Sequence, residues 1–197
     1  MPSTRLPDAG SPRETDLLVL LGGLLPPDMD PTGTTRVLSE TEVEHFPTEV
    51  RPTFAFFART RTRSEARAFV VSQGGVAADV DRLVADGILA RLPTGSTAEM
   101  AAVLARLRVL VTGIPTDVGA AEEGVLVTAR DGASTRVSHD AAALLAGAAG
   151  GPALETTVHL VSQHAAVPES QVWDVLVPAL TALLAIGAAC LVPEAVA

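Results

Sequence analysis

Histidine and cysteine are the residues in this sequence whose type could support catalysis or metal binding. The histidines are His45, His139, His159 and His164. His159 and His164 are five residues apart, which differs from the i, i+4 spacing that places two metal ligands on one helical face. The single cysteine, Cys190, lies in an apolar run, as is typical of a buried, inert thiol. The sequence therefore predicts no metal site, no cofactor and no catalytic nucleophile.

Arginine side chains gather in one part of a chain that contains no lysine. The clustered residues are Arg51, Arg59, Arg61, Arg63 and Arg67. Guanidinium groups bind carboxylates through paired hydrogen bonds, so this cluster could contact an acidic peptide or an acidic patch on a partner protein. Solvated helix ends and a loop also explain the same residues. The sequence leaves both interpretations open.

The overall composition excludes several classes of protein. The chain has 197 residues, 48% of them apolar, which suffices for one domain or two small ones. Its net charge of −9 disfavours a general nucleic-acid binder or a binder of anionic membranes. A single cysteine excludes an intramolecular disulfide and is typical of a cytoplasmic protein.

Two apolar runs resemble membrane segments at first sight. Residues 17–25 lack the positive flank of a signal peptide, because acidic residues precede them. Residues 175–192 are uncharged, but Pro178 and Gly187 interrupt them. We expect a buried strand for the first run. For the second we expect the end of a helix at Gly187, followed by a strand over 188–192.

The elements that would position a site are best defined in the last third of the chain. Two short runs rich in Val and Thr flank Asp131-Gly132, a pair that favours a tight type I′ hairpin turn. Three helical patterns follow, over residues 139–147, 154–165 and 169–186. The order is therefore strands first and three helices afterwards.

Three segments of the chain recur in the same order, which indicates two similar units. The recurring pairs are 35–40 with 135–140, 71–76 with 161–167, and 83–93 with 183–193. The predicted divisions are a disordered tail (1–15), an N-terminal unit (16–93), a linker with a bridging helix (94–115, the helix over 98–111) and a C-terminal unit (116–197). The helices expected in the first unit are 40–46, 52–58, 64–72 and 76–86.

The predicted fold class is α+β, with two units that resemble tandem winged helices. Each unit would have a β-hairpin, three helices and a closing strand. A DNA-binding winged helix needs basic and amide side chains on its third helix. Here that helix carries three aspartates against Arg82 in the first unit, and two acidic residues with no basic one in the second. Phosphate would repel these surfaces, which argues against DNA binding.

Residues 124–193 resemble the PqqD-like recognition element of pathways that modify ribosomal peptides. The matching features are the Asp131-Gly132 turn, the strand over 134–138 that leads directly into Asp140-Ala-Ala-Ala-Leu-Leu, Gly150-Gly151 after the first helix, and the leucines of the third helix. The first unit matches only as a degenerate copy. This resemblance concerns the fold and not a set of catalytic residues.

Members of that family bind an unmodified leader peptide as an added strand, beside the third helix. The resemblance therefore implies peptide-binding residues on one strand and one helix. They are Ser134, Thr135, Arg136 and Val137 on the strand, and Val172, Trp173, Leu176 and Leu180 on the helix. Trp173 is either an anchor for an apolar peptide side chain or a core residue.

The sequence thus predicts a non-catalytic, cytoplasmic peptide-binding protein. It would present a precursor peptide to a modifying enzyme and form a hetero-oligomer with it. By analogy with the family, that enzyme is a multinuclear iron oxidase or a radical-SAM enzyme. No nucleic-acid or membrane partner is expected. Two other classes stay open: an acidic tandem winged-helix adaptor that binds a protein helix, and a transcriptional regulator.

Overall fold

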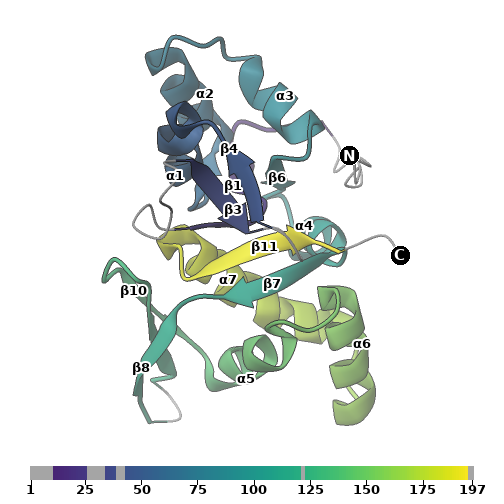
Figure 1. Ribbon diagram of the computed structural model, residues 1–197. Coiled ribbons are helices and arrows are strands. Elements are labelled where there is room, and N and C mark those ends of the chain that lie inside the picture. The colour runs from purple at the N-terminus through teal and green to yellow at the C-terminus, as the bar shows by residue number, and fades with distance from the viewer. Residues whose placement is uncertain (1–10, 26–33, 39–42, 121–122, 195–197) are drawn as a thin grey trace.

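The computed structural model describes residues 11–25, 34–38, 43–120 and 123–194. Within these residues the chain forms seven α-helices and several small antiparallel sheets, so the expected α+β class is confirmed. Figure 1 shows the pair β7–β11 across the middle of the molecule, with the first-half helices on one side and α5 and α6 on the other.

The first half begins with strands and continues with helices. Its elements are β1 (Leu17–Leu20), β2 (Gly23–Leu24), β3 (Thr35–Leu38), β4 (Val43–Phe46), the 3-10 helix η2 (Thr48–Val50), α1 (Arg51–Phe57), β5 (Arg61–Thr62), α2 (Arg63–Ser72), α3 (Asp79–Ala85) and β6 (Leu89–Leu92). Strands β2, β3 and β4 form an antiparallel meander. Strand β6 returns to pair with β1, whose other neighbour is β5.

After one helix, the second half repeats this order without counterparts of η2 and β5. Its elements are α4 (Thr97–Leu104), β7 (Leu107–Val111), β8 (Ile114–Val118), β9 (Val125–Thr128), β10 (Ser134–Val137), α5 (His139–Ala148), α6 (Leu154–Ala165), α7 (Glu169–Ile186) and β11 (Ala189–Pro193). Strands β8, β9 and β10 form a second meander, and β11 closes the unit by pairing with β7.

The pairing of the strands relates the two halves element by element. Thr35 of β3 faces Phe46 of β4, and Val125 of β9 faces Val137 of β10 in the corresponding place. By their places in the two meanders, β3 and β9 are the middle strands, and β4 and β10 are the outer strands that follow them. The sequence similarity between residues 35–40 and 135–140 instead matches β3 with β10, which occupy different places in the two meanders.

The similarity between residues 83–93 and 183–193 does coincide with a shared backbone motif. Gly87 and Gly187 end α3 and α7 in the left-handed conformation, with φ of 72° and 75°. The next amide in each case donates to a carbonyl five residues back, at 3.0 Å and 2.9 Å. This is the Schellman arrangement, which glycine adopts without a Cβ clash.

One predicted helix is a strand. Residues 40–46 were expected to be helical, and residues 40–42 lie outside the described residues, but β4 covers the rest. Exposure alternates along β4, which is the period of a strand. Phe46 packs edge-on against Phe54, with ring centroids 5.0 Å apart, and this contact fixes the inward face.

The predicted bridging helix over 98–111 is only half helical. Helix α4 ends at Leu104, and β7 follows. Buried Leu107 and Val109 alternate with more exposed residues, and the strand pairs with β11. Pairing with a segment eighty residues later in the chain overrides the local helical pattern.

The tip of the β9–β10 hairpin differs from the expected two-residue turn. Ala129 accepts a hydrogen bond from the Gly132 N–H (2.9 Å) and donates one to the Ala133 carbonyl (2.7 Å). Gly132 has φ of 89°, whereas Asp131 has no positive φ. The loop therefore has three residues, with a type I turn and a glycine bulge instead of a type I′ turn.

Strand β1 separates two hydrophobic cores. Leu18 and Leu20 face a smaller core with α1, α2 and α3, whereas Val19 and Leu21 face a larger core that includes most of the second half. Leu21 also forms a parallel bridge with Leu191. Burial on both faces explains why the apolar run there is continuous and does not alternate.

Helix α7 lies at the centre of the larger core. Among the described residues it is the one helix long and apolar enough to span a membrane by length and composition. Seven of its residues are nevertheless buried inside the protein, and it packs against α4, α5, α6, β10 and β11. Its bounds, and those of α6, are as the sequence predicted.

Candidate functional site

Strand β10 is an edge of its sheet. It pairs with β9 and with no other strand of the described residues. The bond from the Ala129 N–H to the Ala133 carbonyl sets the phase of the ladder, so Thr135 and Val137 direct their backbone groups toward β9. The backbone N–H and C=O groups of Ser134 and Arg136 consequently point away from the sheet.

The side chains of β10 divide between the core and the solvent. Val137 is 6% exposed and belongs to the larger core, and Thr135 is half-buried. On the outer face, Ser134 Oγ lies 2.9 Å from Thr128 Oγ1, and Arg136 Nη2 donates to Asp117 Oδ2 at 2.9 Å. The four predicted strand residues therefore lie together, and the outer face is already held by polar contacts across the strands.

The opposite edge of the same sheet, β8, is blocked. Pro115 lacks a backbone donor, Asp117 adds a charge, and the register with β9 shifts between these two residues. Proline, charge and bulges on an edge strand hinder the addition of another strand. Strand β10 contains no proline and pairs with β9 without a register shift, and its one charged residue, Arg136, is paired with Asp117. Strand β8 is therefore less open to an added strand than β10, because of Pro115 and the register shift.

Most of the residues predicted on the helix do not line that edge. Val172, Leu176 and Leu180 are 4%, 1% and 0% exposed and pack in the larger core. Trp173 is half-buried and lines a cavity of about 380 Å³ between α4, α6 and α7, together with Glu155 and other residues. The structure places Trp173 beside α4, and of these four side chains only Val172 lines the cavity that Asp140, just after β10, also lines.

A different stripe of α7 runs beside β10. At one end, Val175 shares a cavity with Asp140, just after the strand. At the other end, Ile186 shares a cavity of about 280 Å³ with Ala129, Arg130 and Asp131, just before the strand. Val175 and Ile186 are about 16 Å apart along the helix axis at 1.5 Å per residue.

Sequence reasoning missed this stripe although a signal was present. Val175, Ala182 and Ile186 are half-buried, and their spacings of seven and four residues keep them on one helical face. The prediction chose Leu176 and Leu180 for their spacing on one helical face, and the structure buries that face in the larger core.

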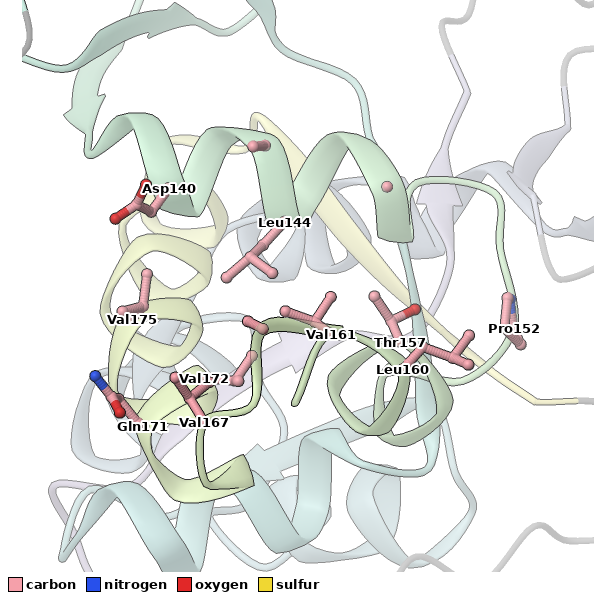
Figure 2. A pocket seen from close by; sticks show the side chains of 13 residues that line it. Asp140, Leu144, Pro152, Thr157, Leu160, Val161, Val167, Gln171, Val172 and Val175 are labelled. Carbon is pink, nitrogen blue, oxygen red and sulfur yellow. The ribbon is translucent and has the colours of Figure 1, made fainter. Parts of the chain in front are cut away.

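A cavity near β10 lies between α5, α6 and α7. Its volume is about 630 Å³. Figure 2 shows Leu144 of α5 and Val161 of α6 directed into the space between the helices, with Val172 and Val175 of α7 beside it. Asp140 is the only charged residue among those that line the cavity.

The arginine cluster does not form one surface patch. Arg63 donates to Asp81 Oδ1 at 2.7 Å, and Arg67 pairs with Glu14 and Asp81. The other three members contact different parts of the chain. Arg59 pairs with Asp131, Arg51 donates to the Leu25 carbonyl (3.1 Å), and Arg61 donates to the Phe56 carbonyl (3.2 Å). All five therefore have partners within this chain.

The ion-pair network also affects protonation. Burial raises the pKa of Asp81, but the hydrogen bonds and charges of Arg63 and Arg67 outweigh this effect, and the pKa lies below its ordinary value of 3.8. The Thr62 backbone N–H, in a capping box, likewise lowers the pKa of Glu65. Both effects are structural, since these residues stabilise α2.

The described residues hold no group of three or more His, Cys, Asp or Glu placed to bind a metal ion. Burial raises the pKa of Cys190 to about 11, so its thiol is protonated at neutral pH and is a poor nucleophile. His159 contacts Glu169 (2.7 Å) and Gln163 (2.8 Å), at the exposed junction of α6 and α7. These contacts resemble a surface network more than a catalytic site.

Comparison with models of protein families, with curated proteins and with solved structures yields no match to this chain.

Proposed function

We propose that this chain is a non-catalytic protein that captures an extended precursor peptide by strand addition at β10. The observation that carries this proposal is the difference between the two edges of one sheet. Pro115 and the adjacent register shift hinder strand addition at β8, whereas the backbone N–H and C=O groups of Ser134 and Arg136 point outward on β10. Main-chain bonding to such an edge supplies affinity for many peptide sequences.

The proposal includes a fold-level interpretation. The repeated order of a strand, a meander, three helices and a closing strand is compatible with two tandem winged-helix-like units, the second of the PqqD-like type. By that analogy the chain delivers a leader peptide to a peptide-modifying enzyme in the cytoplasm, an iron oxidase or a radical-SAM enzyme, as part of a hetero-oligomer. The five arginines are not assigned to the enzyme contact, because each has a partner within the chain.

The test removes one outward donor from the edge. Peptides are first selected from a random twelve-residue mRNA-display library on the immobilised wild-type chain, and their affinity is then measured for Arg136→Pro. Proline has no N–H and is tolerated at a sheet edge, so we expect a loss of at least about tenfold in affinity with the fold retained. Val137→Pro is unsuitable, because the Val137 N–H faces β9 and its loss would weaken the hairpin itself.

Arg136→Ala is the matched control. It removes the same ion pair with Asp117 but keeps the backbone donor. We expect its affinity to stay within about threefold of the wild type, since an exposed ion pair contributes little. A folded Arg136→Pro variant that binds the selected peptides as well as Arg136→Ala does would contradict strand addition at β10. A library that yields no binding peptide would contradict peptide capture altogether.

A further inference from the structure

The cavity between α5, α6 and α7 is suited to an apolar ligand group. Its lining is mostly aliphatic, and Thr157 and Gln171 are its uncharged polar members. Leu160, at its rim, is 58% exposed. A volume of about 630 Å³ falls within the range of ligand-binding pockets, and the cavity can hold more than one side chain.

One negative charge lies at this cavity. Asp140 is exposed, in the first turn of α5, and makes no ion pair within the described part of the chain. The other lining residues given for the cavity are uncharged, so a cation at this end would pair with Asp140. An apolar group with a neighbouring positive charge therefore complements the site better than a purely apolar one.

The cavity begins three residues after the end of β10, at Asp140. Ser138 follows β10 directly and caps α5, its side chain accepting a hydrogen bond from the Ala141 N–H. Asp140 is two residues further, and Figure 2 shows it at the start of α5 on the side of Val175 of α7. A chain laid along β10 beside α7 that extends past Val137 would thus reach the cavity at Asp140.

We infer that this cavity is the specificity pocket for the peptide that adds to β10. It would take a bulky apolar side chain of that peptide, while Asp140 binds an adjacent lysine or arginine. This inference rests on the proposed strand addition and adds to it the residue classes that the peptide must carry. Backbone pairing alone is tolerant of sequence, so the pocket would supply the selectivity.

Two alanines of α5 provide a matched pair of variants. Ala143 and Ala146 are both exposed, but only Ala143 lines the cavity. Ala143→Trp would fill the pocket, whereas Ala146→Trp adds the same side chain to the same helix outside it. With peptides selected from the random library on the wild-type chain, we expect Ala143→Trp to lower the affinity at least about tenfold and Ala146→Trp to change it less than about twofold.

The charge is tested by repeating the selection on Asp140→Asn. Peptides selected on the wild type should be enriched in Lys or Arg next to a bulky apolar residue, and those selected on Asp140→Asn should lose the basic residue but keep the apolar one. Glu155→Gln is the control. It removes an acid from the first turn of α6, outside this cavity, and should leave the enrichment unchanged.

The outcomes separate this inference from the proposed function. Peptides that need the Arg136 N–H but bind Ala143→Trp and Asp140→Asn normally would overturn the pocket assignment and leave strand addition standing. Peptides whose binding is abolished by Ala143→Trp but unaffected by Arg136→Pro would overturn the inference, because the pocket would then bind them without strand addition. Self-association of the wild-type chain in sedimentation, lost in Ala143→Trp, would show that a second copy fills the cavity and would overturn it too.

Discussion

The two halves of the molecule differ in the length of their third helices, α3 and α7. Helix α3 has 7 residues and packs mainly on α2 and β6. Helix α7 has 18 residues and packs on β10 as well as on β11. Both helices end in the same glycine motif, so the extra length of α7 lies toward its N-terminus.

The greater length of α7 bears on which of the two meanders can bind an added strand. Both β4 and β10 are outer strands of a meander, and His45 corresponds to Arg136 by register. A helix beside the edge is what distinguishes the second half. Val175 and Ile186 of α7 lie at the two ends of β10 and offer apolar surface to an added chain. The short α3 provides no comparable length.

The largest expected effect is the loss of stability when a buried side chain of α7 or α3 is shortened. Leu180 of α7 and Val80 of α3 are both 0% exposed. Leu180→Ala should lower the free energy of unfolding by about 3–4 kcal/mol, and Val80→Ala by about 2 kcal/mol, because leucine loses one more buried carbon than valine does. Urea denaturation measures both. A smaller loss for Leu180→Ala than for Val80→Ala would refute the central role of α7 in the larger core.

The two glycine motifs provide a sharper comparison. Gly87→Ala and Gly187→Ala each force alanine into the left-handed region, which costs about 1–2 kcal/mol. A Cβ at Gly187 would meet Arg59 at an ordinary contact distance of 3.5 Å, and one at Gly87 would meet nothing within 4 Å. We therefore expect the two substitutions to lower the free energy of unfolding, measured by thermal denaturation, by similar amounts. Losses that differ by more than about 1 kcal/mol would break the equivalence of the two motifs.

The smallest expected effect is a pH dependence in the first half. A carboxylate whose pKa is lowered by folding stabilises the folded state above its unfolded pKa, and this contribution is lost as the pH falls through the folded pKa. For Asp81 that window lies at and below about pH 4, since its ordinary value is 3.8. The Asp81 side chain is 49% exposed, so solvent screening limits the contribution to about 1 kcal/mol or less.

Unfolding measured between pH 7 and pH 3 tests this window, with Asp81→Asn as the comparison. The wild type should lose more stability than the variant over the acidic part of this range. Parallel curves for the two proteins would mean that the Asp81 interactions with Arg63 and Arg67 do not stabilise the fold.

The sequence alone predicted those elements whose ends are fixed by local chemistry. Ser138 caps α5, and Gly187 ends α7, so the second-half helices were located correctly. Strands β4 and β7 were missed, because each depends on pairing with a partner strand and not on its own propensity. The sequence also did not predict which face of α7 is buried. Apolar residues occupy more than one of its faces, and only packing decides between them.

In the candidate site, too, features set by local sequence could be predicted, and features set by distant contacts could not. The edge position of β10 follows from a hairpin that leads straight into a helix, which a sequence can reveal. The partners of the arginines could not be predicted, because Glu14 and Asp81 are far from Arg67 in the chain. Likewise the cavity at Asp140 exists only where three helices meet.

Amide hydrogen exchange, measured residue by residue by NMR, tests the central claim most directly. On saturation with a selected peptide, the Arg136 amide should become protected from exchange, because an added strand accepts its outward hydrogen bond. The His45 amide, its counterpart on β4, should exchange as before. Unchanged exchange at Arg136 under saturating peptide, with new protection at β4 or β8 instead, would contradict the account.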